Sequence, residues 1–364
     1  MLCHILPAPW RNNGVALSNE GHQQFHFDMK TNRVADLGGQ ENEKQNDFLS
    51  LHEKMLSKHP GTLIEEYDQI NIDHLREKRL LQKLADEASH IAVTFAGISG
   101  DSGMHKHWQR LCLDGDSYQQ LIEDEYSYRE KLCTRQIFRG TSQFTISDTP
   151  FCMGGNIGLD SSRLLPPFMP VQRNEDGIFG LLLYLCFPKA CQGHLPYAIR
   201  HVPPNRPSQV ELSHALSITP LRANDILLGL LLSMNRQSFE LNAAQNLVAA
   251  GSFLSELSNL TIASFKETIK EKYSRFLQIQ ITSVQQYLHN RPDAPSFWQE
   301  DTKQVLENLK AAIQRDNSFI PSDLPGETSS EKLAVFKELT AKFGRLLTYW
   351  PTIWKAAVEL HRDK

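Results

Sequence analysis

The order of apolar and polar positions predicts an α/β arrangement for roughly the first 215 residues. Residues 90–98, HIAVTFAGI, are rich in β-branched and aromatic side chains and run into the turn signal SGDSG, which is typical of a strand. Residues 178–187, IFGLLLYLCF, are too apolar for a surface helix and predict an element inside the core. A polar helical pattern at 116–131 and one or two short strands at 135–151 lie between them. This alternation favours a mixed sheet layered with helices over a helical bundle.

After Pro207 the sequence changes to long helical patterns. Four or five of them occupy residues 224–360, interrupted at HNRPDAPS and IPSDLPGETSS, with no strand-like alternation of any length. One face carries apolar residues at helical spacing and is expected to pack in the core: Phe265, Ile269, Tyr273, Phe276 and Ile279. We therefore expect a poorly patterned segment at 1–48, an α/β domain at 49–215, and an all-helical C-terminal domain or extension at 216–364.

Composition and charge indicate an ordinary soluble globular chain. The 364 residues are 40% hydrophobic and carry a formal charge of -4, with Lys and Arg scattered among nearly equal numbers of Asp and Glu. No nucleic-acid partner is expected, because there is no basic run. The six cysteines form no C-x-x-C pair, so we expect reduced thiols in a cytoplasmic compartment. The N-terminus lacks the features of a signal peptide, and no apolar segment approaches the ~18 residues that span a membrane.

A glycine-rich turn and an acidic pair are the most informative features of the sequence. Gly154 and Gly155 permit a positive φ or the close approach of a ligand to the backbone, and Asn156 can hydrogen-bond through both amide groups. About twenty residues later, Glu175 and Asp176 stand directly before the buried helix. The preceding LLPPFMPVQR has three prolines and exposes apolar side chains beside the pair, as in a shaped cleft wall. The structural alternative is a plain turn, followed by a helix cap worth ~0.3–1 kcal/mol.

The motifs GGNIGLD, RNEDG and RHVPP together resemble the second half of the catalytic domain of nucleotide-sugar glycosyltransferases of the A-type (GT-A) fold. The resemblance covers about residues 91–206 and implies a GT-A-like sheet layer. It implies a nucleotide-diphosphate sugar as donor, and Asp176, or failing it Glu175, as the base that deprotonates an acceptor hydroxyl. The identity of the acceptor does not follow from it. The residues implied to bind donor or acceptor are Gly154, Gly155, Asn156, Asp160, Arg173 and Asn174.

The same resemblance implies a divalent metal ion, Mn²⁺ or Mg²⁺, under the donor diphosphate. His201 in RHVPP corresponds to the late histidine that completes such a site, and Arg200 or Arg206 would neutralise diphosphate. The D-x-D that normally holds the metal has no unique counterpart, although carboxylates are ligands that these ions prefer. The candidates are Asp101, Asp114, Asp116 and Asp28. Asp101 follows the strand at 90–98, whereas WQRLCL before the D-G-D pair is a poorer strand pattern.

Two functions of different classes remain. The first is a metal-dependent glycosyltransferase-like enzyme, and the second is a catalytically degenerate form of the fold that presents its helical half to a protein partner. An active enzyme is expected to bring Asp101, Asp114 or Asp116 within coordination reach of His201. It is also expected to place Gly155, Asn156, Asp176 and His201 around one cavity. A Ser or Cys hydrolase is disfavoured, because the chain has no G-x-S-x-G and its cysteines show no motif.

Overall fold

The computed structural model describes most of the chain beyond residue 47. The described ranges are 14–16, 48–65, 78–101, 106–139, 144–150, 152–201, 203–234, 242–315 and 319–362. Asp28 and most of the segment at 1–48 lie outside them. Every other residue predicted to act in the site has a described backbone.

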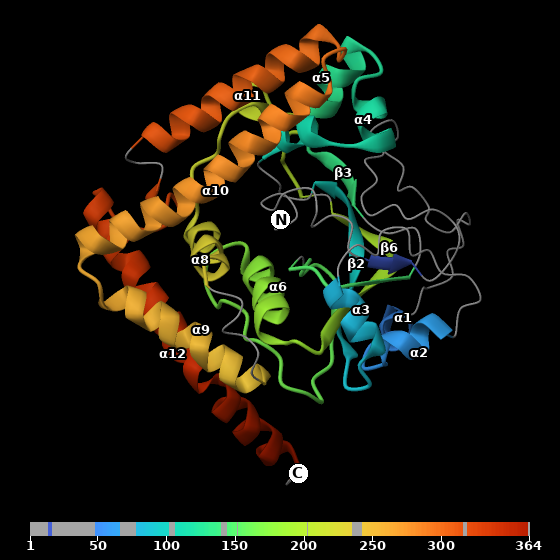
Figure 1. Cartoon of the computed structure of the whole chain (residues 1–364), viewed down its shortest axis with the longest axis vertical. Helices are drawn as coiled ribbons and strands as arrows, with labels where there is room; N and C mark the ends of the chain where they lie inside the picture. Colours follow the sequence, from blue (N-terminus) through green and yellow to red (C-terminus); the bar gives the residue numbers. More distant parts are fainter. Residues whose placement is uncertain are drawn as a thin grey trace.

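Two long parallel strands form the middle of a mixed sheet (Figure 1). The described strands are β1 (Gly14–Ala16), β2 (His90–Asp101), β3 (Gln136–Arg139), β4 (Thr145–Ser147), β5 (Ile157–Leu159) and β6 (Ala190–His201). Their order is β1-β4-β6-β2-β3, and β5 pairs with β2 as well. Among these pairings β2 and β6 are parallel and the others antiparallel. The predicted strand at 90–98 is therefore an inner strand of an α/β layer, as expected.

The two long strands end together. Gly100 of β2 is the register partner of His201 of β6. Gly100 has a φ of +101°, and a Cβ there would lie 2.3 Å from the His201 carbonyl oxygen, so this close approach requires glycine. The register brings Asp101 and His201 to the same edge of the sheet.

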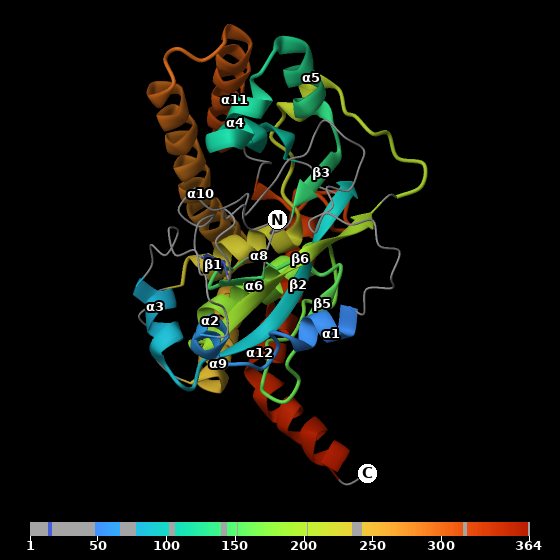
Figure 2. The same ribbon diagram turned by 90° about the vertical axis from the view of Figure 1, so that its right-hand side faces the viewer.

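Helices flank the sheet, and the second half of the chain is helical (Figures 1 and 2). The helical elements are α1 (Phe48–Glu53), α2 (Pro60–Glu65), α3 (Lys78–Ala85), the 3-10 helix η3 (His107–Cys112), α4 (Gly115–Leu121), α5 (Glu125–Cys133), α6 (Glu175–Cys186), α7 (Leu212–Ala215), α8 (Ala223–Leu232), α9 (Ala243–Asn259), α10 (Ile262–Asn290), α11 (Ser296–Gln314) and α12 (Ser329–Arg362). α6 lies between the sheet and the pair α8 and α9, while α1 to α3 lie on the other side of the sheet. In the described residues after 222 every element is a helix, which confirms the predicted helical half.

One local prediction was wrong. The helical pattern at 116–131 forms two helices, α4 and α5, because the Asp124 side chain accepts a hydrogen bond from the Ser127 N–H at 2.8 Å and begins a new helix. The segment WQRLCL, whose strand pattern is the poorer one, lies in η3 except for Leu113, which follows it. Arg110 in η3 donates to two carbonyl oxygens at the end of α5, at 2.7 and 3.0 Å, which holds this segment against α5.

One hydrophobic core runs through both halves of the chain. It contains Val93 of β2, most of α6, and apolar side chains from α8 to α12. Both ends of α6 are also bonded to the helical half. Asn174 Nδ2 donates to the Asp225 carboxylate of α8 at 3.0 Å, and Asn246 Nδ2 of α9 donates to the Cys186 carbonyl at 2.9 Å. The helical half therefore supports α6 directly.

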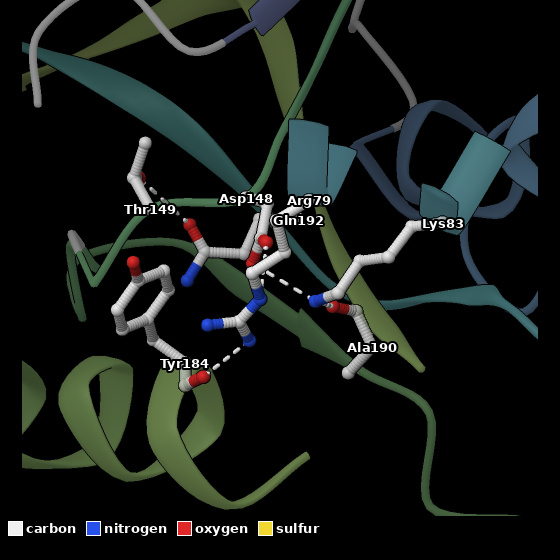
Figure 3. A network of polar contacts seen from close by, with 7 residues as sticks. All are labelled: Arg79, Lys83, Asp148, Thr149, Tyr184, Ala190 and Gln192. Atoms are coloured by element: carbon white, nitrogen blue, oxygen red, sulfur yellow. Dashed lines mark hydrogen bonds and ion pairs between the residues drawn. The ribbon is translucent and has the colours of Figure 1, made fainter. Parts of the chain in front are cut away.

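A smaller core lies on the other side of the sheet, and a buried ion network joins α3 to the sheet and to α6 (Figure 3). The smaller core joins apolar side chains of α1 to α3 to Ile91 and Cys191. The Asp148 carboxylate accepts a hydrogen bond from the Lys83 ammonium at 2.9 Å and pairs with the Arg79 guanidinium at 2.8 Å. Asp148 and Lys83 are both 3% exposed, so both charges are shielded from water and each is stabilised by the opposite charge of the other. The network ties α3 to the sheet.

Neither disulfides nor membrane-spanning helices occur among the described residues. None of the described helices combines the length and the apolar character that crossing a membrane requires. The five described cysteines are buried and form no disulfide with one another: Cys112, Cys133, Cys152, Cys186 and Cys191.

Candidate functional site

A pocket of about 580 Å³ lies where the ends of β2 and β6, the glycine turn and the start of α6 meet. A volume of this size is typical of sites for small organic ligands. The lining residues are Ala96, Gly97, Ile98, Met153, Gly154, Gly155, Asn156, Met169, Pro170, Val171, Gln172, Arg173, Asn174, Glu175, Asp176, Ile199 and His201. The structure thus brings Gly155, Asn156, Asp176 and His201 to one cavity, as the sequence predicts, although their chemical roles stay predictions.

The backbone on either side of the acidic pair is fixed by two residues, Asn174 and Gly177. Asn174 has a φ of 78° and a ψ of 27°, in the left-handed region that asparagine tolerates better than most residues. A Cβ on Gly177 would lie 2.3 Å from Asn174 Oδ1, so glycine is required there. Asn174 is buried and its Nδ2 is bonded to α8, so this side chain fixes the turn into α6 even though the residue lines the pocket. This turn therefore determines how the Glu175 and Asp176 side chains are oriented.

The Asp176 carboxylate joins the glycine turn to α6. Its Oδ1 accepts a hydrogen bond from the Gly177 N–H at 2.8 Å, and its Oδ2 accepts one from the Gly154 N–H at 3.2 Å. The group is half-buried at the helix N-terminus, where the helix dipole stabilises a negative charge. Each oxygen keeps a further lone pair. Asp176 is therefore a rigidly held carboxylate that still has capacity to accept a proton.

Two further charged residues face the pocket from exposed positions. Glu175 and Arg173 both line it, and neither has a hydrogen bond or ion pair with the described part of the chain. Their charges are therefore open to a ligand. A guanidinium suits phosphate oxygens, and a carboxylate suits a hydroxyl group.

The glycine turn is open, and its backbone is not strained. Neither Gly154 nor Gly155 has a positive φ, so one of the two predicted reasons for glycine does not apply. A Cβ on Gly155 would meet nothing within 4 Å, and a Cβ on Gly154 would lie 3.4 Å from the Asp176 Cβ. The missing side chains leave space on the pocket side of the turn. This supports the other reason, a close approach of a ligand to the backbone.

The sheet edge does not assemble a metal site from the described side chains. Nδ1 of His201 is hydrogen-bonded to the Asp101 carbonyl oxygen, which leaves only Nε2 for a metal ion. The buried Asp101 carboxylate is paired with Nη1 of Arg206 at 3.2 Å. Across the described ranges, no three His, Cys, Asp or Glu side chains are grouped so that they could hold a metal ion. The charge of Asp101 is already offset by its arginine.

Three more candidate residues lie outside the pocket lining. Asp160 follows β5, is buried, and accepts two hydrogen bonds from the residue two positions later, at 3.1 and 2.5 Å. Asp114 accepts from the Tyr287 hydroxyl at 2.9 Å and from Arg291 at 2.7 Å, which ties the start of α4 to the end of α10. For Asp116 the structure describes only the backbone, within α4. The described contacts of Asp160 and Asp114 are structural.

Two groups of residues around the pocket are not predicted from the sequence. Residues 96–98 and Ile199 form an apolar wall beside His201 that depends on the pairing of β2 with β6, which has no local signal. Behind the glycine turn, His52 of α1 contacts Asn156 from 104 positions away. By contrast, residues 169–172 come from the proline-rich segment that was predicted as a cleft wall.

Comparisons with known proteins do not assign the chain to a family. No protein-family model, no curated protein and no solved structure matches it.

Proposed function

We propose that the pocket binds a nucleotide-diphosphate sugar and transfers the sugar to an acceptor hydroxyl. The resemblance of the motifs to GT-A glycosyltransferases supports this, together with one observation. The Asp176 carboxylate is bonded to the Gly154 N–H, so the candidate base and the candidate donor loop form one continuous wall. Transfer requires this, because base, acceptor and donor must meet in one cavity.

In the proposed reaction, Asp176 takes the proton of the acceptor hydroxyl while the hydroxyl oxygen attacks the anomeric carbon of the sugar. A carbon–oxygen bond forms there. The bond between that carbon and the diphosphate oxygen breaks, and its electron pair leaves with the nucleoside diphosphate. The open space beside Gly155 admits the donor to the backbone, and Arg173 supplies a cation for the departing diphosphate.

The described side chains fit the implied metal ion poorly. The carboxylate of Asp101 is paired with Arg206, and that of Asp114 with Arg291. The proposed roles of Asp176 and Arg173 therefore do not depend on Mn²⁺ or Mg²⁺. Binding measured with and without Mn²⁺ decides whether the donor needs one.

A thermal-shift screen tests donor binding. The full chain is mixed with UDP, GDP, CDP and their sugar conjugates, with and without Mn²⁺. A ligand that binds only the folded state stabilises it by about 2.7 kcal/mol at a hundred times its Kd. We expect nucleotides of one base to raise Tm, and the Gly155→Val variant, which fills the open side of the turn and binds about tenfold more weakly, to keep only about half of that stabilisation. If no nucleotide raises the Tm of the wild-type protein, the proposal is wrong.

A second candidate is an interaction protein, and the end of α12 favours it. This helix extends beyond the rest of the molecule (Figure 2), and Tyr349, Ile353 and Leu360 on it are 62, 46 and 70% exposed. Apolar side chains exposed on a projecting helix are typical of contact surfaces. With a second copy of the chain as the partner, this candidate predicts concentration-dependent association in sedimentation experiments that Leu360→Glu abolishes, together with no nucleotide-induced shift in Tm. Association that survives the substitution would argue against it.

A further inference from the structure

A chain of hydrogen-bonded side chains links α1 to the pocket behind the glycine turn. The Thr94 hydroxyl of β2 lies 2.7 Å from Nδ1 of His52, and Nε2 of His52 lies 2.5 Å from Oδ1 of Asn156. Thr94 and His52 are buried, whereas Asn156 lines the pocket. A Cβ on Gly158 would lie 2.6 Å from Thr94 Oγ1 and 2.7 Å from His52 Nδ1. The last glycine of GGNIG is therefore required by the side chains behind the turn.

Thr94 determines where the protons of this chain lie. In one arrangement, the Thr94 hydroxyl donates to Nδ1 of His52, and a protonated Nε2 donates to Asn156 Oδ1. In the other, a protonated Nδ1 donates to Thr94, and the Asn156 amide is turned so that its nitrogen donates to Nε2. The second arrangement leaves the hydrogen of the fully buried Thr94 hydroxyl without an acceptor among the described residues. The first arrangement pairs every polar group and is favoured.

We propose that His52 is a positioning residue that turns the Asn156 amide so that its N–H donors face the pocket. Oδ1 is engaged by His52, while Nδ2 has no acceptor in the described part of the chain and is not among the buried unpaired atoms. The pocket thus presents two N–H donors at this point. They select an oxygen acceptor of the ligand, a phosphate or a hydroxyl oxygen. The choice of ligand rests on the proposed function, whereas the orientation of the amide does not.

The tautomer of His52 tests the orientation directly. A long-range ¹H–¹⁵N correlation spectrum of the full chain distinguishes protonated from unprotonated ring nitrogens. The His52 signals are assigned by their loss in His52→Gln. In a spectrum recorded at a pH of about 8, we expect a proton on Nε2 and none on Nδ1. A proton on Nδ1 with an unprotonated Nε2 would overturn the proposal, whether or not the protein binds nucleotides.

Variants of Thr94 test the consequence for binding, because Thr94 does not line the pocket. Thr94→Val keeps the shape and removes the donor that fixes His52, whereas Thr94→Ser keeps the hydroxyl. With UDP and UDP-glucose as probes, we expect Thr94→Val to raise Kd about tenfold, as for the loss of one hydrogen bond to a charged oxygen, and Thr94→Ser to restore the wild-type value.

The two probes separate the sources of the contacted oxygen. Weaker binding of both assigns the contact to a diphosphate oxygen, and weaker binding of UDP-glucose alone assigns it to a sugar hydroxyl. Equal affinities of the folded Val and Ser variants would overturn the role of His52 in selecting the ligand. If the wild-type protein binds no nucleotide in the wider screen, the proposed function fails, and the tautomer still decides the orientation of Asn156.

Discussion

Replacing Asp176 by Asn is the sharpest test of the proposed chemistry. The carboxylate accepts hydrogen bonds from the N–H groups of Gly177, at 2.8 Å, and Gly154, at 3.2 Å, but an amide has only one acceptor oxygen. Asn therefore loses one bond and the charge at the start of α6. Because Gly154 is exposed, water replaces part of the lost hydrogen bond, and losing this bond costs a net of about 1 kcal/mol. The lost charge costs about 0.3–1 kcal/mol more. We expect the free energy of unfolding to fall by about 1–2 kcal/mol.

A loss of this size cannot imitate a loss of catalysis. A protein with an unfolding free energy of about 5–15 kcal/mol stays more than about 99% folded after it. Removing a general base slows transfer about 10²–10⁴-fold, which is about 3–5 kcal/mol of activation free energy. Sugar transfer, nucleotide affinity and urea unfolding are measured on the same preparation. We expect transfer to fall at least about 10²-fold while nucleotide affinity is retained.

Glu175→Gln is the matched control. Glu175 precedes Asp176, is exposed, and makes no hydrogen bond with the described residues, so we expect near-normal transfer and stability. Transfer by Asp176→Asn within a few-fold of the wild-type rate would refute the assignment of the base. A large loss in Glu175→Gln alone would move the role to Glu175. Unfolding of Asp176→Asn together with lost nucleotide affinity would identify a structural cap.

Other perturbations test the open turn, the ion network and a buried histidine. Gly155→Val should change the free energy of unfolding by less than ~0.5 kcal/mol but weaken nucleotide binding, measured by calorimetry, about tenfold. Unchanged binding would show that no ligand approaches this turn. Asp148→Ala leaves Lys83 buried without its carboxylate and should lower the free energy of unfolding in urea by about 3–5 kcal/mol. The double variant Asp148→Ala/Lys83→Met should recover much of this loss. Equal stability of the single and the double variant would show that the buried charge of Lys83 is not what destabilises the protein. Burial, together with nearby guanidinium groups, lowers the pKa of His107 from 6.5 to about 3, so between these values the unfolded chain binds a proton that the folded chain does not. The free energy of unfolding should therefore fall with falling pH in this window, by up to about 1.4 kcal/mol per pH unit for this proton. Between pH ~6 and ~4.5, His107→Gln should show a shallower dependence of the free energy of unfolding on pH than the wild-type protein. An identical dependence in both proteins would contradict this role of His107.

The sequence predicts those elements that are decided locally. The β-branched run HIAVTFAGI forms β2, the apolar run at 178–187 lies in α6, and the loss of alternation after Pro207 gives α8 to α12. The pairing of β2 with β6 joins residues about a hundred positions apart, and no local pattern encodes it. The split at Asp124 shows how one capping side chain overrides a continuous polar pattern.

The candidate site was predictable where sequence neighbours share one wall of the pocket. The glycine turn and the acidic pair each act as a short local unit, so their patterns could be recognised. Asp101 and Asp114 were ambiguous because their partners, Arg206 and Arg291, are distant in sequence. The contact between His52 and Asn156 spans 104 positions and became visible only in the fold.

The position of α6 also bears on how the chain folds as it is synthesised. A nascent chain that ends near residue 215 already contains every described strand and all of α6. It lacks α8 and α9, which cover the far side of α6, and it lacks Asp225 and Asn246, which bond its two ends. Until those helices emerge from the ribosome, one face of an almost wholly apolar helix has no cover and is open to aggregation or to chaperones.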